Sequence, residues 1–212
     1  MSTTVDPEEA TFYNRLSDVW WTDPKLEVLK NIAYTIVPYI CSQTISTGIA
    51  NNSSENGSGS LRDLEVLEVG CGGGFLSEHL ARTGCNLTSI DVAVDLLYVA
   101  KQHATNDPTL PAIQYLNEAI EDHCKKNYQK YDIVASNFVL EHVNEPDYFI
   151  KCCSQCVKPT GSLFISTIAK TFWAWFIIIF LSEYLFRIIP IGSHFMNKFI
   201  NATTTEGFIK SS

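Results

Sequence analysis

The chain has 212 residues, of which 46% are hydrophobic and 18% charged, and this is typical of one globular domain with a buried core. The formal net charge of −8 argues against nucleic acid as a partner, because phosphate binding needs a basic face. The seven cysteines show no metal-ligand spacing. Those at Cys152, Cys153 and Cys156 are expected to be packing thiols, which suit a reducing compartment.

Composition divides the chain into segments. The N-terminal residues are acidic and contain no long apolar run, so they predict neither a signal peptide nor a transit peptide. Residues 8–40 predict one or two helices, with an aromatic pair at Trp20 and Trp21. The polar, low-complexity stretch NNSSENGSGS predicts a flexible insert. The expected organisation is a helical cap (1–50), the insert (51–60), an α/β core (61–170), an apolar segment (171–200) and a short tail (201–212).

A glycine-rich loop joins two predicted strands. A strand at 64–69 runs into the sequence GCGGG at 70–74, a helix follows at 75–83, and the second strand ends at Asp91. Glycines at alternate positions allow positive φ and close approach of a ligand, and the helix start presents unpaired N–H groups. An acid about 20 residues beyond the first glycine is placed to bind ribose hydroxyls. The pattern indicates an adenine nucleotide ligand; an ordinary tight turn is the alternative.

Strands and helices alternate through the rest of the core. Strands are expected at 64–69, 87–90, 113–116, 131–136 and 162–168, and helices at 75–83, 94–103, 120–127 and 146–157. This order predicts a doubly wound, mostly parallel sheet with helices on both faces. Ligands of such sheets bind at the carboxyl ends of the strands, where Asp91, residues 118–120 and residues 137–142 fall.

The stretch from Phe172 to Leu181 has ten uninterrupted apolar residues, and Glu183 and Arg187 follow at helical spacing. A spanning helix needs roughly 20 apolar residues, so a membrane crossing is not expected. A buried helix and an interfacial helix that dips into a lipid surface both fit the pattern.

Together these motifs resemble those of the ubiquinone-biosynthesis O-methyltransferases, which are class I S-adenosylmethionine-dependent methyltransferases. The form E-x-G-x-G-x-G at 68–74 and Asp91 are similar to the cofactor motif of the whole superfamily. The Trp pair and the run EYLFRIIPIGSH at 183–194 are the more specific features. Family members continue past this run with further strands, so the C-terminal strands of the Rossmann-like fold are expected to be missing here.

The resemblance implies S-adenosylmethionine as the cofactor and a polyprenylated phenol or catechol as the substrate, methylated on a ring hydroxyl. It also implies a membrane surface and other ubiquinone-biosynthesis proteins as partners. The implied location is peripheral, on the matrix side of the mitochondrial inner membrane; the alternative is the bacterial cytoplasm or plasma membrane.

Residue by residue, the resemblance assigns cofactor binding to Glu68, Gly70, Cys71, Gly72, Gly74, Asp91, Ala119, Ile120 and Asn137. In the family, an E-x-x-E-H segment supplies metal-ligand carboxylates and a histidine. Here Glu141 and His142 match, whereas Phe138 replaces the first acid. Glu141 and His142 are therefore expected to be catalytic and to hold Mg²⁺ at a weakened site. The alternative is that they lie at a solvated loop-to-helix junction and only cap the helix.

Two other functions stay open on the sequence. One is a methyltransferase for a different small molecule. The other is a non-catalytic scaffold in a biosynthetic assembly, favoured by Phe138, by the stop at Ser212 and by Ile36, which stands where the family carries an arginine near the cofactor carboxylate.

Overall fold

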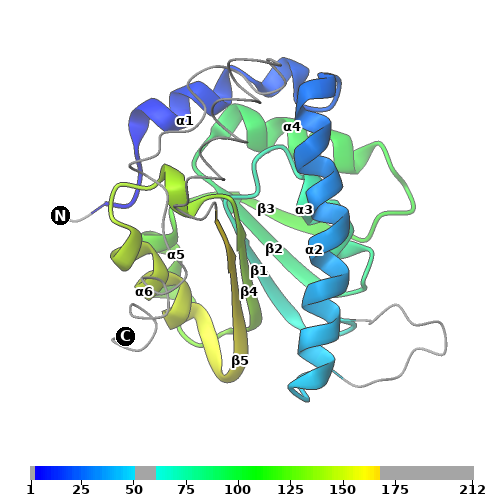
Figure 1. Ribbon diagram of the computed structural model, residues 1–212, viewed down its shortest axis with the longest axis vertical. Coiled ribbons are helices and arrows are strands. Elements are labelled where there is room, and N and C mark those ends of the chain that lie inside the picture. Colours follow the sequence, from blue (N-terminus) through cyan, green and yellow to red (C-terminus); the bar gives the residue numbers. More distant parts are fainter. Residues whose placement is uncertain (1–2, 51–60, 168–212) are drawn as a thin grey trace, which may run out of the picture.

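A computed structural model describes residues 3–50 and 61–167 of the chain. The predicted insert (51–60), the apolar segment (171–200) and the tail (201–212) lie outside the described residues, as do the expected missing strands. One sheet forms the centre of the described part, with helices on both faces (Figure 1). None of the described helices is long and apolar enough to cross a membrane.

The sheet has five parallel strands in the order β3-β2-β1-β4-β5. Its strands are β1 (Glu65–Val69), β2 (Asn86–Asp91), β3 (Ile113–Asn117), β4 (Tyr131–Asn137) and β5 (Val157–Ser166). The strand order reverses direction between β1 and β4, so the switch point of the sheet lies there, beside the glycine loop. The prediction of a doubly wound α/β fold is confirmed.

In the described part of the chain, six α-helices cover the sheet or its end. They are α1 (Pro7–Asn14), α2 (Glu27–Ser46), α3 (Phe75–Ala81), α4 (Val94–Thr105), α5 (Ile120–Lys126) and α6 (Pro146–Cys156), with short 3₁₀ turns at Ser17–Val19 (η1), Pro24–Leu26 (η2) and Leu140–His142 (η3). The side chain of Asp6 caps α1 by accepting the backbone N–H groups of Glu8 and Glu9. The predicted helical cap is therefore two helices joined by tight turns.

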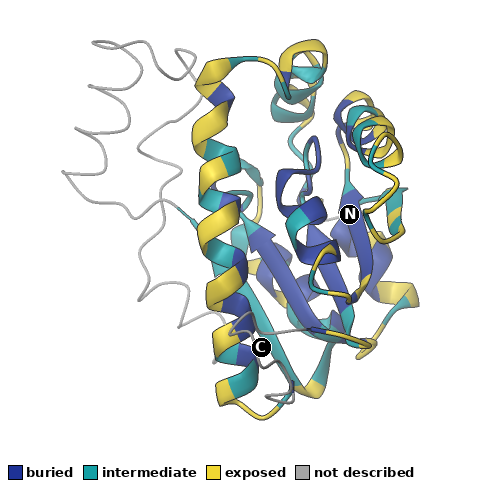
Figure 2. Ribbon diagram, turned by 90° about the vertical axis from the view of Figure 1, so that its right-hand side faces the viewer, coloured by how far each residue is buried: buried dark blue, intermediate teal, exposed yellow. Residues whose placement is uncertain are grey.

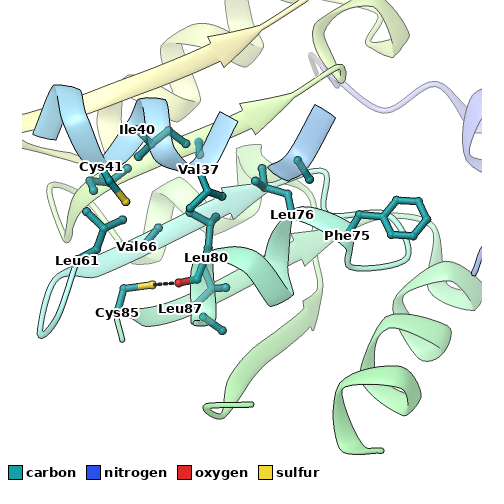
Figure 3. Close-up of a cluster of buried hydrophobic side chains, with 14 of the residues drawn as sticks. Val37, Ile40, Cys41, Leu61, Val66, Phe75, Leu76, Leu80, Cys85 and Leu87 are labelled. Carbon is teal, nitrogen blue, oxygen red and sulfur yellow. Dashed lines mark hydrogen bonds between the residues drawn. The ribbon is translucent and has the colours of Figure 1, made fainter. Parts of the chain in front are cut away.

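Side chains alternate between two cores because successive residues of a strand point to opposite faces. Val66 packs with α2 and α3, whereas Leu67 packs with α5 and α6. Figure 3 shows the first core, where Val37 and Ile40 of α2 face the side chains of β1 and α3. The same helix presents its other side to solvent, as Figure 2 shows by colour.

The second core contains four thiols, Cys124, Cys152, Cys153 and Cys156, all buried between α5, α6 and the sheet. All seven cysteines of the chain are free and buried, and Cys152, Cys153 and Cys156 pack in this core as predicted. Burial raises the pKa of Cys153 well above its ordinary value, so this thiol stays protonated.

The last described strand differs from the prediction. A strand was expected at 162–168, but β5 begins at Val157 and contains an irregularity. Tyr131 pairs with Val157, whereas Ile133 pairs with Ser162, so the intervening residues bulge out of the ladder. The Lys158 ammonium lies 2.8 Å from each carboxylate oxygen of Asp132 on β4, and this contact stabilises the bulge.

Candidate active site

A cavity of about 460 Å³ lies at the carboxyl ends of β1, β2 and β4. The glycine loop, Asp91, residues 118–120 and residues 137–139 form its sheet side. Residues of α1 and of the chain leading into α2 form its other side. In Figure 1, α1 lies at one end of the sheet rather than on a face of it. The N-terminal cap and the switch point of the sheet thus enclose one site.

The glycine loop has the backbone that the motif predicts. Gly70, Gly72 and Gly74 have φ of 76°, 52° and 92°. A Cβ added at Gly70 would lie 2.3 Å from a methyl carbon of Val139, so a larger residue does not fit there. The loop can therefore bring bare backbone to the edge of the cavity.

Asp91 ties this loop to the end of β2. The N–H of Gly72 donates to its Oδ2 and the N–H of Ala93 donates to its Oδ1, both at 2.7 Å. Burial raises the pKa of Asp91, and the backbone donors oppose that rise. A carboxylate offers about four acceptor sites, so these donors do not use its full acceptor capacity. Asp91 therefore positions the loop as well as bordering the cavity.

Glu68 lies beneath the loop and is only 2% exposed. The hydroxyls of Ser77 on α3 and Ser89 on β2 both donate to its Oε2, the latter at 2.8 Å. Burial raises the pKa of Glu68 to about 7. This side chain joins β1, β2 and α3 and also borders the cavity.

The other predicted cofactor residues are placed as follows. Cys71, Ala119, Ile120 and Asn137 all border the cavity. Asn137 accepts a hydrogen bond from the Ser166 hydroxyl, which orients its amide. Gly74, in contrast, is the N-cap of α3 and does not line the cavity.

His142 borders the cavity and is held by two side chains of α1. Its Nδ1 lies 3.1 Å from Oε2 of Glu9, and its Nε2 lies 3.0 Å from the Tyr13 hydroxyl. A carboxylate can only accept, so Nδ1 carries a proton, and in the neutral ring Nε2 accepts from Tyr13. Burial raises the pKa of Tyr13, so its phenol stays protonated. The site contains an imidazole whose acceptor nitrogen already contacts a phenol.

Glu141 faces elsewhere, although it is the neighbour of His142 in the sequence. It is 2% exposed, does not border the cavity, and accepts a hydrogen bond of 3.0 Å from the Thr167 hydroxyl. Its Oε1 is buried without a hydrogen-bond partner among the described residues. Burial raises the pKa of this carboxyl. Of the predicted pair, His142 borders the cavity and Glu141 does not.

The side chains present do not fit Mg²⁺. Within residues 3–50 and 61–167, no three His, Cys, Asp or Glu residues converge as metal ligands. Both ring nitrogens of His142 are engaged, and Mg²⁺ prefers oxygen ligands in octahedral geometry. Phe138, at the position of the missing acid, borders the cavity with φ of 55° and offers no oxygen. The expected magnesium finds no support here.

Sequence reasoning did not assign site roles to Trp20, Glu9 or Tyr13. Trp20 packs against the glycine loop and stacks on Phe75 with ring centroids 5.3 Å apart. The tryptophan pair was visible as a motif, but Glu9 and Tyr13 contact a residue more than a hundred positions away. No local spacing could have revealed those contacts.

Comparisons with known proteins agree with this geometry. Residues 67–165 match the family described as Methyltransferase domain. The crystal structure of magnesium protoporphyrin IX methyltransferase from Synechocystis, with bound SAH, is similar with a TM-score of 0.64 at 16% identity, over 96% of this chain and 84% of that one. A S-adenosylmethionine-dependent methyltransferase of Aquifex aeolicus has a TM-score of 0.53 at 16% identity, over 98% and 87% of the two chains. The fold is that of the class I S-adenosylmethionine-dependent methyltransferases.

Relatives in sequence show which family of methyltransferases the chain belongs to. The mitochondrial ubiquinone biosynthesis O-methyltransferase of rat is 34% identical over 99% of this chain and 60% of its own length. That of Yersinia enterocolitica is 33% identical over 97% of this chain and 78% of its own length. The chain belongs to the ubiquinone biosynthesis O-methyltransferase family, and it spans 60% of the length of its rat relative.

Proposed function

We propose that this chain transfers the methyl group of S-adenosylmethionine to a phenolic hydroxyl of a polyprenylated benzenoid intermediate of ubiquinone biosynthesis. The relatives in rat and Yersinia carry the name of that reaction. One observation supports the proposal above others: a single cavity is bordered by the glycine loop, by Asp91 and by the imidazole of His142. The predicted cofactor-binding motif and a proton acceptor thus border the same cavity.

The cofactor would lie across the ends of β1 and β2. The backbone of the glycine loop would face its methionine half, and Asp91 would accept hydrogen bonds from its ribose hydroxyls. Ala119 is the N-cap of α5 and Ile120 is its first residue, and both border the same cavity. When bound, the cofactor supplies an electrophilic methyl group on a sulfonium.

His142 is the proposed proton acceptor. A phenol with a pKa of about 10 is mostly protonated at neutral pH and is a weak nucleophile. As the phenolic oxygen bonds to the methyl carbon, its proton passes to Nε2 of His142. The C–S bond breaks with its electron pair left on sulfur, which gives S-adenosylhomocysteine and the methyl ether. The carboxylate of Glu9 stabilises the imidazolium that forms.

The Tyr13 hydroxyl occupies the position that the substrate hydroxyl would take on Nε2. Binding of the substrate therefore requires Tyr13 to give up this hydrogen bond. The mechanism contains no step through magnesium, because the donor set at His142 does not fit that ion. The predicted catalytic role of Glu141 stays a prediction, since its side chain faces Thr167.

Apolar side chains on the α1 and α2 side of the cavity suit a lipophilic substrate. They include Val5, Phe12, Leu16, Leu26, Leu29 and Ile32. The rat and mouse relatives are named mitochondrial, and bacterial relatives match equally well. For such a lipophilic substrate, the position that we propose is peripheral, on the inner mitochondrial or bacterial plasma membrane, alongside other proteins of the pathway.

Calorimetric titration with S-adenosylmethionine, followed by methyl transfer to a short-tailed catechol, tests the proposal. We expect turnover that falls by about 10²–10⁴-fold in His142→Asn, with cofactor affinity changed less than about threefold. Turnover should be the same in EDTA and in added Mg²⁺. Activity that appears only with Mg²⁺ would refute the assignment of His142 as base. Cofactor binding without turnover under any condition would favour the scaffold.

A further inference from the structure

The glycine loop has few side chains that could hold it in one conformation. Four of the five residues at 70–74 are glycines, and Gly70, Gly72 and Gly74 have positive φ. Glycine loses more conformational freedom than any other residue when it becomes ordered. A ligand that meets a disordered loop has to supply the free energy of ordering, which lowers its affinity. Contacts that order this loop in advance therefore affect how tightly it binds a ligand.

The end of β2 holds the first half of the loop. The N–H groups of Gly70 and Cys71 both donate to the carbonyl oxygen of Ile90, at 2.9 Å and 3.1 Å. The N–H of Gly72 donates to Asp91 at 2.7 Å. These three loop residues also border the cavity. The sheet thus orders the half of the loop that a ligand in the cavity would contact.

Trp21, from the N-terminal cap, holds the second half of the loop. Its indole Nε1 donates to the carbonyl oxygen of Gly73 at 2.9 Å. Its ring also packs edge to face on Phe75, the first residue of α3, with ring centroids 4.6 Å apart. Trp21 does not border the cavity. It can therefore affect a ligand there only through the loop.

Three helices fix the indole of Trp21. The ring stacks on the imidazole of His103 on α4, with ring centroids 3.4 Å apart and an interplanar angle of 1°. Nδ1 of His103 lies 2.6 Å from Oε1 of the buried Glu78 on α3, and it carries the proton because a carboxylate only accepts. The ammonium of Lys30 on α2 lies 5.5 Å from the centre of the indole, within the range of cation–π attraction. The indole N–H is therefore already directed at Gly73 in the chain without a ligand.

We propose that Trp21 is a positioning residue: through its hydrogen bond to Gly73 it orders the glycine loop and so raises affinity for the methionine half of S-adenosylmethionine. The inference rests on the proposed function, under which the loop backbone faces that half of the cofactor. Binding then does not have to order the second half of the loop. The N-terminal cap would thus support cofactor binding through Trp21, separately from the contacts that α1 makes with His142.

The test removes the indole N–H of Trp21 and keeps a ring of nearly the same size. Placing 3-benzothienylalanine at position 21 replaces the N–H by sulfur. We expect affinity for S-adenosylhomocysteine, measured by calorimetry, to fall about 3–10-fold, which is the effect of one neutral hydrogen bond. Affinity for 5′-methylthioadenosine, which lacks the amino acid end of the cofactor, should change less than about twofold. In methyl-transfer assays, the KM for S-adenosylmethionine should rise by the same factor, while kcat changes less than about twofold.

Two further variants accompany this one. Trp21→Phe also lacks the N–H, and we expect at least the same loss of affinity for S-adenosylhomocysteine. Gly48→Ala is the control for a general loss of stability, because Gly48 follows the end of α2 with φ of 77° and does not border the cavity. Alanine at this position strains the backbone. It should lower Tm and leave the affinities for both ligands unchanged.

Unchanged affinity for S-adenosylhomocysteine in both Trp21 variants would overturn the inference and leave the proposed function intact. Equal losses for the two ligands would also overturn it, because they would indicate a general loosening of the site. The same holds if neither Trp21 variant unfolds cooperatively, since Trp21 would then be needed for folding itself. If the natural chain binds neither ligand, the proposed function fails as well.

Discussion

Replacement of Gly70 by alanine is expected to destabilise the protein more than the same replacement at Gly48. The two glycines have almost the same backbone, with φ of 76° and 77°. A Cβ at Gly48 would meet nothing within 4 Å, whereas one at Gly70 would lie 2.3 Å from Cγ2 and 3.0 Å from Cγ1 of Val139. The pair therefore separates the cost of a left-handed backbone from the cost of a steric clash.

The left-handed backbone costs an alanine about 1–2 kcal/mol, and forcing a methyl group into a packed contact adds about 1–3 kcal/mol. Gly48→Ala should thus lose about 1–2 kcal/mol and Gly70→Ala about 2–5 kcal/mol. For a chain of this size, each kcal/mol lowers Tm by about 2–4 °C. Urea unfolding followed by circular dichroism measures both losses on the same scale.

Val139→Ala provides the internal check, because it removes both methyl carbons and leaves the nearest atom, its Cβ, at 3.2 Å. In the double variant with Gly70→Ala, we expect about 1–3 kcal/mol of the loss to be recovered relative to the sum of the single changes. If Gly70→Ala loses no more stability than Gly48→Ala, the loop does not press against Val139 as described. The same conclusion follows if the losses of Gly70→Ala and Val139→Ala simply add in the double variant.

Three further outcomes are expected. Because the pKa of Glu68 is raised from 4.5 in the unfolded chain to about 7, this side chain contributes its full stabilisation below pH 4.5 and loses it as pH rises through about 7, a change of about 3 kcal/mol. Glu68→Gln should flatten this pH dependence of the unfolding free energy in urea titrations, and an unchanged slope would contradict the assignment. Asp91→Ala should abolish cofactor binding measured by calorimetry, and it should also lower Tm because two backbone N–H groups lose their acceptor. Normal cofactor affinity in this variant would exclude Asp91 as the ribose acceptor. Glu9→Gln should lower turnover about tenfold while cofactor affinity stays the same, since His142 loses its counter-charge, and equal losses in both quantities would indicate a structural role only.

The sequence alone determined the features that depend on local spacing. Alternating apolar strands and amphipathic helices require a parallel sheet with two covered faces, and that sheet is present. The alternate glycines from Gly70 to Gly74 require positive φ, and all three adopt it. The position of Asp91 at the end of the next strand then brings it to the loop, because parallel neighbouring strands end at the same edge. Each of these conclusions follows from the period of one or two adjacent elements.

Only the tertiary structure decided what surrounds His142. Glu141 and His142 are neighbours on η3, but His142 borders the cavity whereas Glu141 is buried and accepts a hydrogen bond from Thr167. The partners of His142 come from α1, more than a hundred residues earlier, and no sequence period links the two. Whether a histidine is a ligand, a cap or a base depends on what packs against it, and long-range packing alone brought Glu9 and Tyr13 to that ring.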